Sequence, residues 1–102
     1  MNKIVDTIEN YCIKLMSSYC YKHLWVDVNC IDAKSDSELK MQIIIKNRKD
    51  NKTRGILVTV DNDLIKLVDP KAPFKQDGVK YYKSVHGLKL GVNAIARSIC
   101  YD

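Results

Sequence analysis

The sequence predicts an α+β fold: an N-terminal helix, an antiparallel sheet of three or four strands and a C-terminal helix, with both helices packed on one face of the sheet. Apolar residues recur at steps of three and four before residue 21 and again after residue 79. Between these segments they alternate with other residues, at the two-residue period of a half-buried strand. Because two strands alone are marginally stable in water, we expect the helices to cover the apolar face of the sheet.

A chain of 102 residues is long enough for one hydrophobic core, so we expect a single domain over residues 1–102. Hydrophobic residues make up 46% of the chain and charged residues 28%, which is typical of globular proteins. The chain contains no internal repeat, no low-complexity tract and no linker that would divide it.

The first predicted element is an amphipathic helix from residue 2 to about residue 21. Asp6 lies near its N-terminus, where the helix dipole favours a negative charge. Its apolar positions, with charged residues between them, are Ile4, Ile8, Tyr11, Cys12, Leu15, Met16, Tyr19 and Cys20.

Three strands are predicted next, over residues 24–30, 38–46 and 54–60, separated by a polar turn at 32–37 and a loop at 47–53. A short apolar segment at 64–68 fits either a fourth strand or one helical turn, and we favour the strand. The inward-facing residues of the two central strands are Leu39, Met41, Ile43 and Ile45, facing Ile56, Val58 and Val60.

The last predicted element is a helix over residues 79–100. It follows a loop that ends at Gly78, contains two prolines and is held to the body by Phe74. Its core-facing stripe, spaced at four and three, is Tyr81, Val85, Leu88, Val92, Ile95 and Ile99.

The net charge of +5 favours an acidic partner and excludes a protein that mimics nucleic acid with surface carboxylates. The excess lies in two segments: residues 38–60 hold six basic and two acidic residues, and residues 80–102 hold four and one.

The first candidate binding surface is the predicted hairpin loop, where Arg48, Lys49, Lys52 and Arg54 accompany one acid, Asp50. A projecting basic loop can enter a groove of nucleic acid or lie on phosphates. The alternative is that the loop is polar only because hairpin tips are hydrated.

The second candidate surface is the basic face of the closing helix, with Lys80, Lys83, His86, Lys89 and Arg97. A helix that follows three antiparallel strands and is basic near its start resembles, in topology, double-stranded-RNA-binding domains, which use this part of the helix to contact phosphates. The lysines here do not reproduce the close spacing of that family, so no residue role follows from the likeness. The alternative is a solvated outer face.

Four aromatic residues fall outside the predicted core: Trp25, Tyr21, Tyr82 and Tyr101. Exposed Trp and Tyr residues serve as anchors at protein interfaces and as stacking platforms for bases. The alternative is that Trp25 lies on a sheet face beneath a helix.

Enzymatic and metal-binding chemistry has little support in the sequence. Metal-dependent nucleases of one class use an acid on a strand followed by a D/E-x-K pair, and Asp27 with Glu38 and Lys40, or Asp32 with Lys34, has that outline. Short patterns of this kind are common in a chain with 28% charged residues.

We expect no cofactor and no metal, because the chain has no glycine-rich phosphate loop and no closely spaced pair of ligands among its cysteines and histidines, His23 and His86. The four cysteines are expected to be reduced core residues: Cys12, Cys20, Cys30 and Cys100.

The sequence therefore predicts a small cytoplasmic binding module that is not an enzyme and does not enter a membrane. Its favoured partner is a nucleic acid or a nucleoprotein complex. The second hypothesis is a protein-interaction factor, such as an inhibitor from a phage or other mobile element, that binds a host protein through exposed aromatic residues. A metal-dependent nuclease is third, and a homodimer stays an open alternative.

Overall fold

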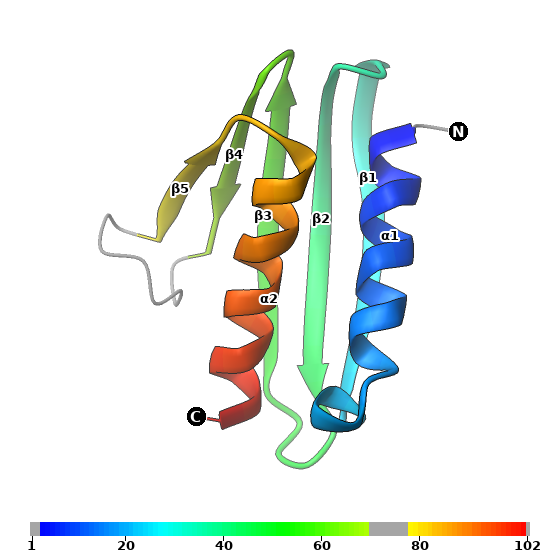
Figure 1. The fold of residues 1–102 in the computed structure, drawn as a ribbon, viewed down its shortest axis with the longest axis vertical. Helices are drawn as coiled ribbons and strands as arrows, with labels where there is room; N and C mark the ends of the chain where they lie inside the picture. Colours follow the sequence, from blue (N-terminus) through cyan, green and yellow to red (C-terminus); the bar gives the residue numbers. More distant parts are fainter. Residues whose placement is uncertain (1–2, 70–77, 102) are drawn as a thin grey trace.

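The computed structural model describes residues 3–69 and 78–101, and every structural statement below concerns these residues. They form, in chain order, α1 (Lys3–Met16), the short 3-10 helix η1 (Tyr19–Tyr21), β1 (Leu24–Ser35), β2 (Glu38–Asn47), β3 (Thr53–Asp61), β4 (Leu64–Val68), β5 (Val79–Tyr82) and α2 (Val85–Tyr101) (Figure 1). The predicted start of the first helix at residue 2, and Phe74, lie outside the described residues.

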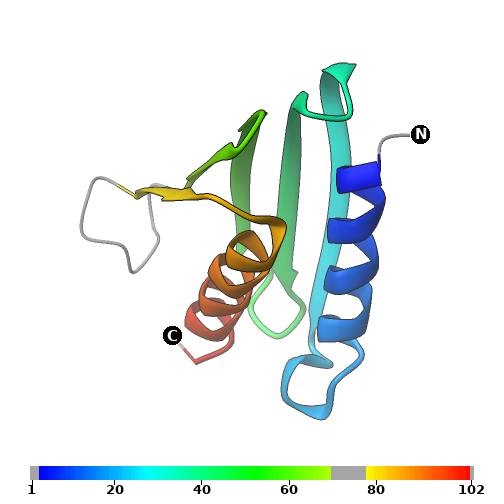
Figure 2. The same ribbon diagram turned by 45° about the horizontal axis from the view of Figure 1, so that its top comes forward.

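The five strands form one antiparallel sheet in the order β1-β2-β3-β4-β5, so each strand pairs with its neighbours in the sequence. Both helices lie on the same face of this sheet (Figures 1 and 2). The predicted α+β class is confirmed, as is the strand at Leu64–Val68, although the sheet has five strands instead of three or four. We call the face that carries no described helix the open face.

The predicted start of the closing helix is wrong, because residues 79–82 form β5. Val79 pairs with Val68 and Tyr81 with Lys66, which extends the sheet by one edge strand. The helix begins at Val85, where Ser84 Oγ accepts a hydrogen bond from the backbone N–H of Gly87 (3.1 Å) and caps it. Tyr81 is consequently 54% exposed instead of lying in the core.

Five strands precede α2, which separates this fold from double-stranded-RNA-binding domains, in which a helix follows three strands.

Two boundaries near the N-terminus also differ from the prediction. α1 ends at Met16, where Ser17 Oγ donates to the carbonyl of Ile13 (2.8 Å) and so competes with the helical pattern. β1 continues to Ser35, five residues beyond its predicted end, and leaves only a tight turn before β2. Register shifts at Cys30/Asp32 and Ala33/Ser35 interrupt the alternation that would have revealed this extension.

The core lies between the sheet and the two helices, as predicted from the alternation in β2 and β3. All seven residues assigned to that face are at most 4% exposed. They join Val5, Ile8 and Cys12 of α1 and Leu88, Val92 and Ile95 of α2 in one cluster. One core therefore supports every described element except β5, whose Tyr82 packs against its margin.

The prediction that the cysteines lie in the core holds for only part of the set. Cys12 is fully buried and Cys100 partly buried, whereas Cys20 and Cys30 are exposed, and all four thiols are free. The apolar pattern predicted burial for both, but Cys20 lies in the η1 turn beyond the end of α1, and Cys30 lies beside a bulge of the edge strand β1.

Candidate functional site

The β2–β3 loop is anchored to the body of the protein at its base. Asn47 is buried, and its amide nitrogen contacts the carbonyl oxygen of Ile99 near the end of α2 (3.4 Å). The next residue, Arg48, donates its backbone N–H to the carbonyl oxygen of His23, just before β1 (2.9 Å). The loop therefore lies beside η1 and the C-terminal end of α2, as Figure 1 shows at the lower end of the sheet.

Hydrogen bonds within the loop fix its backbone. The side chain of Asn47 accepts the N–H of Lys49 and that of Asp50 accepts the N–H of Lys52, both at 2.9 Å. Asn51 has a φ of 61°, in the left-handed region that asparagine tolerates better than most residues. These bonds give the loop one defined shape, which local polar residues determine.

Three of the four predicted cations of this loop are exposed: Arg48, Lys49 and Lys52. We call residues 48–52 the basic tip. Lys52 lies 4.0 Å from the carboxylate of Asp50, an exposed ion pair that contributes little. The basic tip therefore offers its cations to an outside partner.

Arg54 does not belong to the basic tip, and its assignment there is wrong. It is the second residue of β3 and points to the helix-covered side, where its guanidinium lies 3.5 Å from the carboxylate of Asp69. Its side chain is 13% exposed and that of Asp69 is 1% exposed. The sequence pattern missed this pair because Asp69 follows β4, far along the chain.

Trp25 lies on the open face with its side chain 42% exposed, so the alternative that a helix covers it does not hold among the described residues. It pairs across the strands with Lys46. Together with Arg48 and Asn51, these two residues line an open pocket next to the basic tip. The structure thus brings together an aromatic residue and cations that the sequence assigned to two different hypotheses.

Two of the other predicted interface aromatics are packed inside. Tyr21 is only 7% exposed, and its hydroxyl donates to the side-chain oxygen of Asn93 of α2 (3.0 Å). Tyr82 is partly buried against the N-terminal half of α2, and burial raises the pKa of its phenol. Tyr101 ends α2, and its side chain lies outside the described set. The prediction that Tyr21 and Tyr82 are exposed is therefore wrong.

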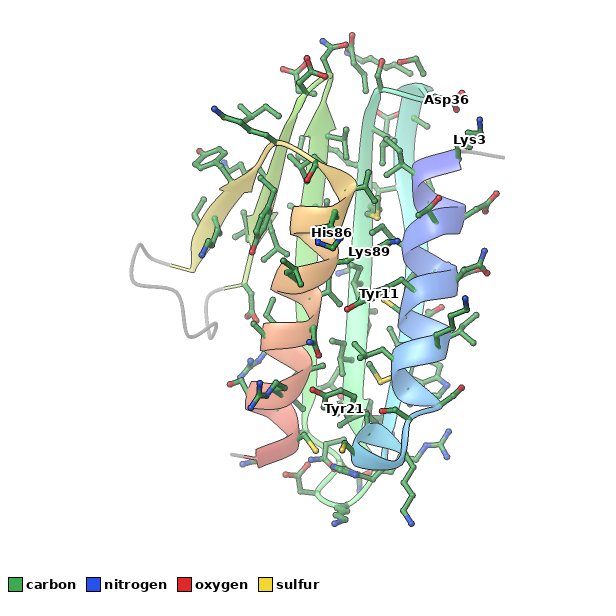
Figure 3. The ribbon with its side chains drawn as sticks, viewed as in Figure 1. Lys3, Tyr11, Tyr21, Asp36, His86 and Lys89 are labelled. Atoms are coloured by element: carbon green, nitrogen blue, oxygen red, sulfur yellow. The ribbon has the colours of Figure 1, made fainter. Side chains whose placement is uncertain are left out.

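The predicted basic face belongs to α2 only in part, because Lys80 lies in β5 and Lys83 lies before the helix begins. Lys80, Lys83, His86 and Arg97 are exposed, whereas Lys89 sits over the ring of Tyr11 (5.5 Å) between the two helices (Figure 3). Thirteen residues of helix separate His86 from Ile99, which corresponds to about 20 Å. The cations near the start of α2 therefore lie away from the basic tip, whereas Arg97 lies two residues from Ile99, whose carbonyl oxygen contacts Asn47 at the base of the loop.

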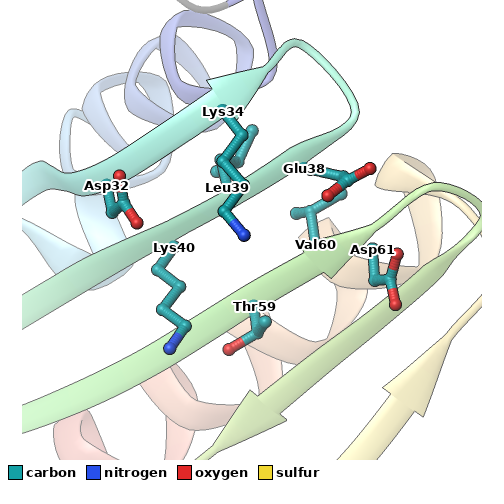
Figure 4. A pocket seen from close by; sticks show the side chains of 8 residues that line it. All are labelled: Asp32, Lys34, Glu38, Leu39, Lys40, Thr59, Val60 and Asp61. Carbon is teal, nitrogen blue, oxygen red and sulfur yellow. The ribbon is translucent and has the colours of Figure 1, made fainter.

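The opposite end of the open face carries a second pocket, of mixed charge (Figure 4). Lys34 and Lys40 accompany three carboxylates there: Asp32, Glu38 and Asp61. Asp27 pairs with Ile44, six residues along β2 from Glu38, so about 20 Å separate the two acids of the first nuclease outline. Within residues 3–69 and 78–101, no three side chains of the His, Cys, Asp and Glu types could hold a metal ion together.

A cysteine and a histidine meet near the base of the loop, which the sequence did not indicate. Cys100 Sγ lies 3.2 Å from His23 Nε2 and 3.2 Å from the carbonyl oxygen of Cys20. Burial raises the pKa of the Cys100 thiol, and Cys20 adds to the rise while Lys49 opposes it. This contact joins the end of α2 to η1 and to the segment before β1.

Comparison with models of protein families, with curated proteins and with solved structures finds no match. Of the helices in the described ranges, neither α1 nor α2 has the length and apolar character that crossing a bilayer requires.

Proposed function

We propose that this protein is a non-enzymatic module that binds nucleic acid, free or within a nucleoprotein complex, through the basic tip. The observation that carries the proposal is the presence of three exposed cations, Arg48, Lys49 and Lys52, on a loop whose backbone is fixed by hydrogen bonds. A fixed loop loses little conformational entropy when its cations contact phosphates.

The distribution of charge along the sheet also favours the end that carries the basic tip as the region that contacts nucleic acid. The basic tip and Lys46 lie at one end of the strands, with Asp50 as the acid among them. The two turns at the other end lie side by side, because Asn62 donates its N–H to the carbonyl of Ser37 (2.7 Å), and they carry Asp36, Glu38, Asp61 and Asp63. Because Lys34 and Lys40 lie beside these acids, the second end has mixed charge, and a polyanion is attracted more strongly to the first end.

A protein-interaction factor, such as an inhibitor from a mobile element, is the second candidate. It is favoured by large apolar side chains that the open face leaves exposed: Leu57 at 40%, Leu64 at 47% and Tyr81 at 54%. Exposed apolar residues mark protein interfaces when they are contiguous. For either candidate we retain the predicted cytoplasmic location as part of the proposal.

The test is a measurement of affinity against salt concentration. Oligonucleotides should bind with log K falling by roughly 0.7 to 0.9 per phosphate neutralised for each unit of log salt. The triple change Arg48→Ser, Lys49→Ser and Lys52→Ser should flatten this slope and weaken binding to all sequences alike, because phosphate contacts carry no sequence information.

A matched control replaces three exposed lysines at the opposite end of the strands, Lys3, Lys34 and Lys40, with serine, which lowers the net charge equally. This control should keep most of the slope. Equal losses in the two triple variants would show that only net charge acts. Absence of any gel shift with single- or double-stranded DNA or RNA at low salt would contradict the proposal.

A further inference from the structure

Trp25 and its neighbours form a pocket whose chemistry goes beyond phosphate contact. The indole is 42% exposed on the open face, and Lys46 and Arg48 line the same pocket with the side chain of Asn51. An aromatic face beside two cations matches a nucleotide, because the base has a π-face and the backbone is anionic. Asn51 adds an amide, which can both donate and accept hydrogen bonds at a base edge.

Resting on the function proposed above, we propose that the pocket formed by Trp25, Lys46, Arg48 and Asn51 binds an unpaired base, which makes the protein a single-strand binder. The base stacks on Trp25 while Lys46 and Arg48 contact the flanking phosphates. In a duplex the base faces are covered by their neighbours, so they cannot stack on the indole without being unstacked at a cost of a few kcal/mol.

The charges around the pocket favour one path for the bound nucleic-acid strand. Asp27 lies two residues further along β1, on the same face, and its carboxylate accepts a hydrogen bond from Asn29 (2.8 Å). Beyond it lie the carboxylates of the second pocket. Phosphates are therefore disfavoured over the centre of the sheet, and the strand continues from Trp25 over the basic tip.

The chain has one tryptophan, so its own fluorescence reports directly on this pocket. We would titrate the protein with oligothymidylate and oligouridylate of about twelve nucleotides, within the usual range of single-strand sites, and with a duplex of equal length. Both single strands should quench the emission of Trp25, and the duplex should leave it nearly unchanged.

Two substitutions test stacking separately from apolar contact, with affinity read from the anisotropy of labelled oligonucleotides. Trp25→Leu keeps an apolar side chain without a π-face and should weaken single-strand binding roughly 5- to 100-fold, the equivalent of losing one stacked base. Trp25→Phe should retain part of the affinity. Duplex affinity should stay within about twofold in both variants, because it depends on phosphate contacts.

The outcomes separate this inference from the proposed function. Equal affinity for single strand and duplex, without quenching, overturns the inference while salt-dependent binding still supports the proposed function. Loss of single-strand and duplex binding together in Trp25→Leu, with an unchanged circular dichroism spectrum, also overturns it. No binding of any oligonucleotide contradicts both.

Discussion

At the scale of single residues, the four cations predicted for the loop divide into two kinds. Arg48, Lys49 and Lys52 are exposed and contribute to the proposed contact surface. Arg54 instead points to the helix side and pairs with the buried Asp69, whose N–H also donates to the carbonyl of Gly78 (2.8 Å). The two kinds should therefore respond differently to substitution: one in binding, the other in stability.

Arg54→Met should destabilise the protein by about 3 to 5 kcal/mol, because it removes the guanidinium that lies 3.5 Å from the buried carboxylate of Asp69. Arg48→Met, the matched change in the basic tip, should cost less than about 0.5 kcal/mol. Urea denaturation followed by circular dichroism measures both. Equal free energies of unfolding in the two variants would show that the ion pair has no structural role.

At the scale of elements, α2 packs against Tyr82 of β5 through two glycines, Gly87 and Gly91. From the sequence alone, these residues indicate only a lower helix propensity. A Cβ at Gly91 would lie 2.1 Å from Tyr82 Oη and 2.6 Å from its Cζ, and a Cβ at Gly87 would lie 3.1 Å from its Cδ1. The Tyr82 ring therefore lies directly against the helix backbone, which explains why a helix contains glycine here.

Gly91→Ala should destabilise the protein by about 1 to 3 kcal/mol, because the ring must move to admit the methyl group. In a Tyr82→Ala background the same change should instead stabilise it by up to about 1 kcal/mol, through the higher helix propensity of alanine. Gly87→Ala is the matched control and should cost less, since its nearest contact is longer. Thermal melts of this double-mutant cycle measure the change of sign, and a cost that persists without the ring would contradict the packing described.

At the scale of the whole molecule, charge is separated along the strands, which run parallel to the longest extent of 37 Å (Figure 1). The basic tip lies at one end, and the turns that carry the acids lie at the other, beside Lys34 and Lys40. Such a field orients the molecule as it approaches a polyanion, so we attribute to it a contribution to the association rate more than to the affinity.

Cys12 reports on whether the molecule opens as one unit. Its side chain is completely buried between α1 and the sheet, with 0% exposure. Burial, and to a smaller extent the charge of Glu9, raise the pKa of its thiol to about 12. Because only the accessible thiolate reacts, an alkylating reagent at about pH 8 should label Cys20 and Cys30 at once and Cys12 only after unfolding. Mass spectrometry of peptides during native labelling measures these rates.

If the protein unfolds cooperatively, the free energy from Cys12 labelling should equal that from denaturant. Much faster labelling would show that α1 separates from the sheet by itself, which would contradict a single cooperative core.

The Cys12 thiol also contributes to the pH dependence of stability. Its pKa is raised in the folded state above the ordinary value of 9.0, so its contribution is complete below pH 9 and decreases as the pH rises toward 12.

The local pattern of apolar residues was sufficient to predict the fold class and the positions of the central strands. The two-residue alternation from Leu39 to Ile45 and from Ile56 to Val60 predicted which residues face the core, because side chains of a strand point to alternate faces whatever surrounds it. The same reasoning predicted Trp25 as outward-facing and residues 48–52 as an exposed basic loop. It did not find β5, because four residues fit the start of a helical stripe as well as an edge strand.

What the tertiary structure decided is which of these residues meet. Trp25 lies in β1 and Arg48 lies in the loop after β2, and only the pairing of these two strands brings both residues to one pocket. Arg54 and Asp69, Tyr82 and Gly91, and Tyr21 and Asn93 are likewise joined by the packing of distant segments. Period and composition are local properties of the chain, whereas a binding pocket depends on the register of strands and on which side of the sheet the helices cover.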